Sequence, residues 1–194
     1  MKTLLIAISA AAVLAGCAST PSTGASASAS AGASATAPAA DAPRAQSATV
    51  NLAPASGSLV SGRLQAMPMG DGVHFTGEIG GLTRNATHAI HIHETGDCSA
   101  VDASSAGGHF NPTGAPHGKV GEGAHHAGDM NNLVANAQGV ARVDVHARGV
   151  SLGGGAGNIL GRAVVVHASP DDYRSQPAGN AGARIACGLV TAGR

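Results

Sequence analysis

The sequence predicts an all-β fold, an antiparallel sandwich or barrel with long loops, preceded by a disordered N-terminal tether. Glycine (29) and proline (9) are too frequent among the 194 residues for a helical bundle. Several short segments instead alternate apolar and polar residues, and glycine-rich turns separate them. Short strands with such turns at regular spacing are typical of sandwiches and barrels.

The N-terminus predicts a signal peptide over residues 1–16. Met1 and Lys2 supply a basic end, and the apolar run that follows to Ala15 is shorter than the roughly 20 residues of a membrane-spanning helix. The segment ends in Leu-Ala-Gly-Cys17, which resembles a bacterial lipobox, whose cysteine is acylated. We therefore expect lipid on Cys17; the alternative is an ordinary secretory signal in which Cys17 has no role.

Residues 17–48 are expected to form a lipidated, flexible linker. Of the 32 residues from Ala18 to Thr49, 29 are Ala, Ser, Thr, Pro or Gly, with no apolar periodicity. Such a segment cannot bury enough apolar surface to offset the entropy of ordering it. As a flexible coil it would span roughly 30 Å, and it would tether a folded domain over residues 49–194.

Within that domain, the clearest strand pattern is Ala141–His146, where apolar side chains fall on odd positions and polar ones on even positions. Further strands are predicted at Ser58–Met67, Gly72–Ile79, Leu160–His167 and Arg184–Val190. Since tryptophan is absent and only three aromatic residues occur, we expect a core of Val, Ile, Leu and Ala.

Histidine is the residue type that points to function. All ten histidines lie between His74 and His167, and imidazole is a common metal ligand. His91 and His93 alternate with Ile90 and Ile92, so a strand would present both imidazoles on one face.

The stretch from Glu94 to Ala137 shows neither helical nor strand periodicity, and a loop of that length in a compact domain is usually functional. It carries His109, His117, His126 and Asp129, and His167 ends a later strand. With His91 and His93 these make seven potential ligands, more than one tetrahedral site uses. Three histidines and a carboxylate suit zinc, four imidazoles suit copper(II), and one bridging imidazole would complete both sites.

These residues occur in runs that closely resemble the copper/zinc superoxide dismutase family, across Thr49 to Val190. The runs are His91-Ile92-His93-Glu94, Gly108-His109-Phe110-Asn111-Pro112, His126-Ala127-Gly128-Asp129, Gly161 to His167 and Gly179 to Gly188. The resemblance implies a Greek-key β-barrel or sandwich with long metal-binding loops. It also implies one copper and one zinc per chain, with the superoxide anion as the substrate.

The resemblance assigns a role to each residue of the motifs. It implies copper ligands His91, His93, His109 and His167, and zinc ligands His109, His117, His126 and Asp129. The shared His109 would bridge the metals, detach from reduced copper and deliver a proton to peroxide. Asp171 would join a copper histidine to a zinc histidine, and Arg184 would guard the copper and attract the anion. His125 also neighbours the zinc position, but the family pattern places histidine three residues before the aspartate and so favours His126.

The family resemblance also implies a disulfide between Cys98 and Cys187, the pair left once Cys17 carries lipid; two free thiols are the alternative. The chain departs from the family pattern at one position that bears on electrostatic steering of the substrate. Eukaryotic members carry a lysine where this chain has an uncharged Gln176-Pro177-Ala178 stretch. Beyond the signal peptide the only lysine is Lys119, for which we weigh a steering role against that of an ordinary solvated side chain.

The remaining histidines are expected to have structural positions. We predict that His88 is a hydrogen-bonded strand residue and that His74 and His146 lie at surface positions of strands. The formal net charge of zero argues against a nucleic-acid partner.

Dismutation of superoxide is the expected function, and a copper/zinc-buffering surface lipoprotein without catalysis is the alternative. A copper chaperone would need an exposed Cys-x-x-Cys pair, which is absent. We expect a lipid-anchored periplasmic protein. Ala18 favours the outer membrane, because an aspartate at that position would signal retention in the inner one. The oligomeric state stays open, a homodimer included.

Overall fold

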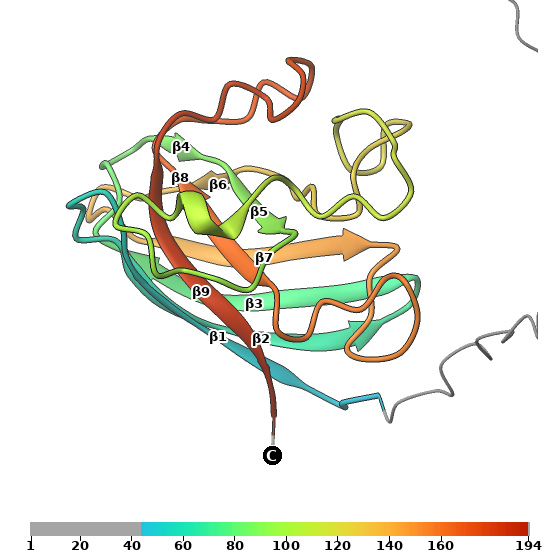
Figure 1. Cartoon of the computed structure of the whole chain (residues 1–194). Helices are drawn as coiled ribbons and strands as arrows, with labels where there is room; N and C mark the ends of the chain where they lie inside the picture. The colour runs from blue at the N-terminus through green and yellow to red at the C-terminus, as the bar shows by residue number, and fades with distance from the viewer. Residues whose placement is uncertain (1–43, 194) are drawn as a thin grey trace, which may run out of the picture. The chain divides into compact units, whose positions relative to one another are not determined.

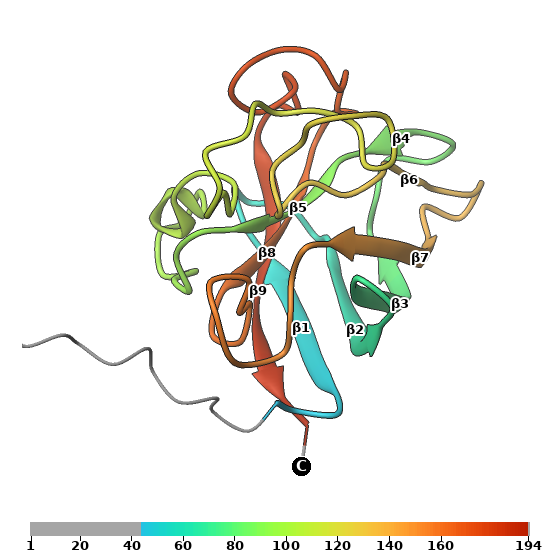
Figure 2. The same ribbon diagram turned by 90° about the vertical axis from the view of Figure 1, so that its right-hand side faces the viewer.

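The computed structural model describes residues 44–193 (Figures 1 and 2). The predicted signal peptide, the lipidation site Cys17 and nearly all of the predicted linker lie outside these residues. The strands are β1 (Ala48–Pro54), β2 (Ser61–Met69), β3 (Gly72–Gly80), β4 (Thr87–His88), β5 (Ile90–His93), β6 (Leu133–Val134), β7 (Ala141–Arg148), β8 (Ala163–His167) and β9 (Arg184–Ala192), with one short 3₁₀ helix, η1 (Ser104–Ala106).

The strands form an antiparallel sheet that curls on itself. Seven of them pair in the order β5-β8-β9-β1-β2-β3-β7, and β4 pairs with β6. Because only Ala89 separates β4 from β5, and β6 packs near β7, the β4–β6 pair lies between the two ends of the large sheet. The chain leaves β3 near one end of the sheet and re-enters it at β5, the opposite end, which is the long connection expected of a Greek key. The predicted all-β fold class is confirmed.

The strand patterns follow the alternation in the sequence. In β7 the odd positions, Ala141 to Ala147, are buried and the even positions face outward. The predicted Leu160–His167 strand begins only at Ala163, because Gly161 adopts a φ of +78° in a turn. Strand β1 was not among the predicted strands, although Ala48, Val50 and Leu52 alternate inward there. That strand sits between β2 and β9 and joins the two halves of the sheet.

The interior is built mainly from Val, Ile, Leu and Ala, as expected, with Phe75 and Phe110 added. Burial of this apolar surface is the main term that stabilises the barrel. The β8–β9 connection, drawn in red, arches over one end of the sheet in both views (Figures 1 and 2). Within residues 44–193, no helix has the length and apolar character needed to span a membrane.

Candidate metal centre

Backbone hydrogen bonds join three segments of the chain next to the candidate metal ligands. The N–H of Ile92 donates to the carbonyl of Gly128, Gly128 donates to Phe110, and Phe110 donates back to Ile92, each at 2.8 Å. A Cβ on Gly128 would lie 2.2 Å from the Ile92 oxygen, so this close approach requires glycine. Since each of the three is next in sequence to a histidine or aspartate of the site, this ring of hydrogen bonds brings ligands together from distant parts of the chain.

Four buried imidazoles form the first cluster. His91, His93, His109 and His167 each offer a ring nitrogen, and these atoms all lie within 4.8 Å of one another. Within the described part of the chain, His91 Nδ1, His93 Nε2, His109 Nε2 and His167 Nε2 are buried and have no hydrogen-bond partner. Buried polar atoms are rarely left unpaired. Four such nitrogens in a set of this composition fit a copper ion.

The opposite ring nitrogens of three of these histidines are engaged, which fixes the tautomers. His93 Nδ1 donates to the Gly107 carbonyl at 2.9 Å, and His167 Nδ1 donates to the Gly182 carbonyl at 3.3 Å. His91 Nε2 contacts Asp171 Oδ2 at 2.9 Å. A carbonyl can only accept, so the proton sits on that nitrogen and the other one keeps a lone pair for a metal.

The second cluster surrounds one carboxylate. His109, His117, His126 and Asp129 are all buried and offer ligand atoms within 4.8 Å of one another. Asp129 Oδ1 lies 2.8 Å, 3.0 Å and 3.3 Å from the Nδ1 atoms of His109, His117 and His126 respectively. Its Oδ2 accepts the backbone N–H groups of Gly118 and His126. Three imidazoles and one carboxylate fit a closed tetrahedral zinc site, and His109 belongs to both clusters.

Asp171 connects the two clusters. Its Oδ2 contacts His91 Nε2 and its Oδ1 contacts His117 Nε2, both at 2.9 Å. Burial lowers the pKa of His117, but hydrogen bonds to Asp129 and Asp171 outweigh it and raise that pKa to about 9. For Asp171 itself, burial raises the pKa, and the two histidine contacts hold it below its usual range. The carboxylate therefore stays charged at neutral pH.

Burial controls the charge of the first cluster. Burial, together with the nearby histidines, lowers the pKa of His91 to about 4, of His93 to about 2 and of His167 to about 3. The three imidazoles are therefore neutral at physiological pH. Neutral imidazole is the form that coordinates a metal ion.

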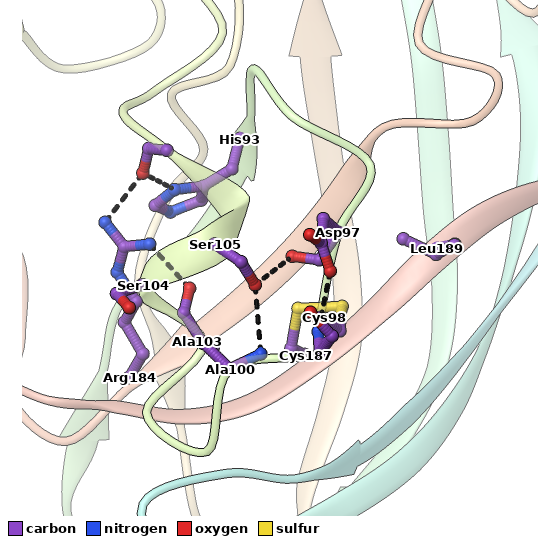
Figure 3. Close-up of a disulfide and its surroundings, with 12 residues drawn as sticks. His93, Asp97, Cys98, Ala100, Ala103, Ser104, Ser105, Arg184, Cys187 and Leu189 are labelled. Atoms are coloured by element: carbon purple, nitrogen blue, oxygen red, sulfur yellow. Dashed lines mark hydrogen bonds between the residues drawn. A yellow bond between two sulfur atoms is a disulfide. The ribbon is translucent and has the colours of Figure 1, made fainter.

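A cavity of about 640 Å³ opens on the first cluster, lined by His93, His109, His167 and, on its rim, Arg184. The Arg184 guanidinium donates to the carbonyls of Ala103 and Gly107, each at 2.7 Å (Figure 3). Two carbonyls thus fix the direction of this cation, and its remaining N–H groups stay available to the cavity.

The predicted disulfide is present. Cys98 and Cys187 are joined, with their Cα atoms 5.8 Å apart and a sequence separation of 89. Figure 3 shows it beside Ser105, whose hydroxyl donates to the Asp97 carbonyl and accepts the Ala100 N–H. The bond ties the loop carrying Ala103 and Gly107 to β9, the strand that begins at Arg184.

Other predicted residues lie outside the clusters. His125 contacts the carbonyl of its neighbour His126 and is not among the converging atoms. His88 is buried and its Nδ1 donates to the carbonyl of His167. Lys119 pairs with Glu122, sits 5.6 Å from the centroid of the Tyr173 ring and lines a separate hollow.

Two residues that position the site were not predicted from the sequence. Gln176 binds both backbone groups of His117, its Oε1 accepting the N–H and its Nε2 donating to the carbonyl, at 2.9 Å each. Asn132 makes a reciprocal pair with the backbone of Asp171, also at 2.9 Å. Neither contact has a spacing signal, because the partners lie 59 and 39 residues apart in sequence.

Comparison with known proteins agrees with this geometry. The sequence pattern of the family described as copper/zinc superoxide dismutase (SODC) matches residues 60–190. The chain belongs to that family. Superoxide dismutase [Cu-Zn] 2 of Aquifex aeolicus is 44% identical over 135 residues, 68% of this chain and 79% of the relative. Superoxide dismutase [Cu-Zn] of Caulobacter vibrioides is 42% identical over 119 residues, 58% of this chain and 68% of the relative.

Among solved structures, a double mutant of a SOD-like protein from Bacillus subtilis superposes with a TM-score of 0.67 and 38% identity, covering 74% of this chain and 96% of that one. Membership of the family makes the chain an enzyme of the superoxide dismutase class, and its two histidine clusters could bind copper and zinc.

Proposed function

We propose that this protein converts superoxide to dioxygen and hydrogen peroxide, with copper at His91, His93, His109 and His167 and zinc at His109, His117, His126 and Asp129. The observation that carries the proposal is the set of four buried, unpartnered ring nitrogens that converge below the cavity. Copper held there would supply the alternating one-electron oxidation and reduction, and zinc would supply a fixed charge beside it.

Arg184 would bind the anionic substrate. Its guanidinium lies on the rim of the cavity and is held by two carbonyls, so little side-chain entropy is lost when an anion arrives. The chain as a whole has no net charge, so a local cation has to provide the attraction.

His109 would handle the proton that peroxide requires. Its Nδ1 faces Asp129 at 2.8 Å, and its Nε2 faces the copper-side cluster and the cavity. Held in place on its Nδ1 side, the ring can take up a proton at Nε2 and release it there to the reduced substrate.

Metal buffering without catalysis is the weaker alternative. It would use the two clusters but has no need of Arg184 on the cavity rim or of the disulfide that anchors the surrounding loop. The relatives that match the chain are named superoxide dismutases, which also does not favour buffering.

Metal analysis together with superoxide decay after pulse radiolysis tests the proposal. We expect copper and zinc near one each per chain and a bimolecular decay rate close to the diffusion limit. Full loading of both metals with decay no faster than that of free buffer would instead support the buffering protein.

For location, we propose a periplasmic protein anchored to the outer membrane through lipid on Cys17, with residues 17–48 as its tether. The support is the sequence alone: the lipobox-like run before Cys17, the Ala/Ser-rich composition after it, and Ala18. Growth with radiolabelled palmitate should label the wild-type chain but not Cys17→Ser. Sedimentation of the lipid-free domain would show whether it forms the homodimer left open by the sequence.

A further inference from the structure

Four outward-facing side chains on β2, β3 and β7 form a second group of soft and imidazole donors, which we call the outer methionine–histidine cluster: Met67, Met69, His74 and His146. Met67 lies opposite His74 in the β2–β3 register, and His74 lies opposite His146 in the β3–β7 register. Their strand neighbours Ala66, Val73 and Val145 are buried, so the cluster faces away from the core. None of its members lines the cavity described above.

The two imidazole rings lie close together on the outer face of the sheet. Their ring centroids are 6.2 Å apart with the planes tilted by 32°. In the copper-side cluster, the rings of His91 and His93 are 6.5 Å apart. Directly opposite side chains on antiparallel strands have Cβ atoms about 4.5–5.5 Å apart, which brings the flexible Met67 side chain within reach of His74. Met69, two residues along the same strand, projects from the same face.

Each imidazole is already held by a carboxylate on one side. His74 Nε2 contacts Asp144 at 3.0 Å, and His146 Nε2 contacts Asp71 at 2.9 Å. Asp71 is shared, because Arg148 also donates to it at 3.2 Å. Both Nδ1 atoms are covered and have no hydrogen-bond partner within residues 44–193. This repeats the arrangement of His91 with Asp171, in which a carboxylate fixes one ring nitrogen and leaves the other for a metal.

The methionines indicate which metal. Met67 and Met69 are 57% and 50% exposed, although methionine side chains usually lie in the core. Thioether sulfur is a soft ligand that selects copper(I), and imidazole also suits copper. Zinc gains little from thioether sulfur, so two methionines beside two histidines favour copper(I).

We propose that Met67, Met69, His74 and His146 form a surface site for copper(I), separate from the buried centre. Binding requires the Nδ1 lone pairs of the two histidines and one or both thioethers, with Asp71 and Asp144 neutralising the charge of the ion. The proposal does not depend on dismutase activity, since any copper-loaded chain with this sheet would carry the site.

Anaerobic titration of copper(I) into the full-length copper/zinc holoprotein tests the site, with a chromogenic copper(I) chelator as competitor. We expect one copper(I) per chain to bind beyond the metal already present. His74→Gln with His146→Gln, and separately Met67→Leu with Met69→Leu, should each weaken its affinity by about tenfold or more. Gln65→Leu is the control. Gln65 lies two residues before Met67 on β2 and is also exposed, so this variant should bind copper(I) as wild type does.

A parallel titration with zinc(II) separates the donor types. The histidine pair should affect zinc and copper(I) alike, whereas the methionine pair should affect copper(I) alone. Absence of an additional copper(I), or equal affinity in all variants, would show that the histidines form only surface ion pairs. Copper(I) binding that depends on the histidines but not on the methionines would overturn the four-residue site. Circular dichroism of each variant checks that the sheet is intact.

Discussion

Arg184 and His93 meet at a single atom, the carbonyl oxygen of Gly107, which accepts from the guanidinium at 2.7 Å and from His93 Nδ1 at 2.9 Å (Figure 3). The residue proposed to bind the anion and a proposed copper ligand are therefore positioned by the same peptide group. Gly107 has a φ of +73°, which favours glycine. Movement of this one peptide would shift both groups together.

Replacing Arg184 should reduce catalysis more than metal binding. We expect Arg184→Ala to lower the rate of superoxide decay about tenfold and to weaken its dependence on ionic strength, because a fixed local cation is lost. Copper content should stay near that of wild type, since His93 keeps its bond to Gly107. Arg142→Ala, an exposed arginine on β7, is the control. Equal rates for the two variants would argue against substrate binding by Arg184.

Replacing Asp171 should loosen the zinc site. An asparagine has a single acceptor oxygen, so Asp171→Asn can accept from His91 or His117 but not from both. We expect zinc affinity, measured by competition with a chelator, to fall by about 10- to 100-fold. Asp172→Asn removes the neighbouring, exposed carboxylate and should leave zinc affinity unchanged. A wild-type affinity in Asp171→Asn would contradict the connecting role.

The disulfide should contribute strongly to stability. Closing a loop of 89 residues stabilises the folded state by about 4–5 kcal/mol in the chain-entropy model. We expect the double variant Cys98→Ser with Cys187→Ser to lose up to that amount in urea unfolding of the metal-loaded domain. Its activity should also fall, because the loop that carries the Arg184 acceptors is released. Unchanged stability would mean that the surrounding contacts alone hold the loop.

The metal-free protein should lose stability as the pH falls below about 6.5. His91, His93 and His167 have folded-state pKa values of about 4, 2 and 3, against about 6.5 for an unfolded histidine. Between pH 6.5 and 4 the unfolded chain binds more protons, so the free energy of unfolding drops by at most about 1.4 kcal/mol per pH unit for each of these histidines.

His117 acts in the opposite sense, because its pKa is raised to about 9. Its contribution is complete below pH 6.5 and is lost as the pH rises through 9. Urea unfolding at a series of pH values should therefore show a maximum near neutrality for the metal-free protein. A stability that stays constant from pH 6.5 to 4.5 would contradict the neutral, buried state of the copper-side histidines.

Lys119 provides a test of long-range steering. Its pairing with Glu122 reduces its net field, so we expect Lys119→Glu to lower the rate at low salt only modestly. The dependence of that rate on ionic strength should also be flatter. Glu122→Gln frees the lysine charge and should change the low-salt rate in the opposite direction. Identical salt profiles for both variants and wild type would leave Lys119 as an ordinary surface side chain.

The sequence alone determined the fold class and the composition of both clusters. Alternation in β7 specifies which side chains face inward, and alternation around His91 specifies that His91 and His93 share one face, because a strand has a period of two. The motifs around His109, His126 and Arg184 match the family pattern, and this match can be recognised from the order of the residues without a structure. The predicted disulfide followed in the same way, from the family motif and the number of cysteines.

Only the tertiary structure decided how these groups are connected. A ring of hydrogen bonds joins Ile92, Phe110 and Gly128, which have no fixed spacing in sequence. The same holds for the hydrogen bonds between Gln176 and the backbone of His117. The outer methionine–histidine cluster likewise depends on strand register. A shift of one residue in the β2–β3 pairing would turn Met67 and His74 to opposite faces. The pairing of β3 with β7, which sets His74 opposite His146, joins strands that are not consecutive and is decided only in the folded sheet.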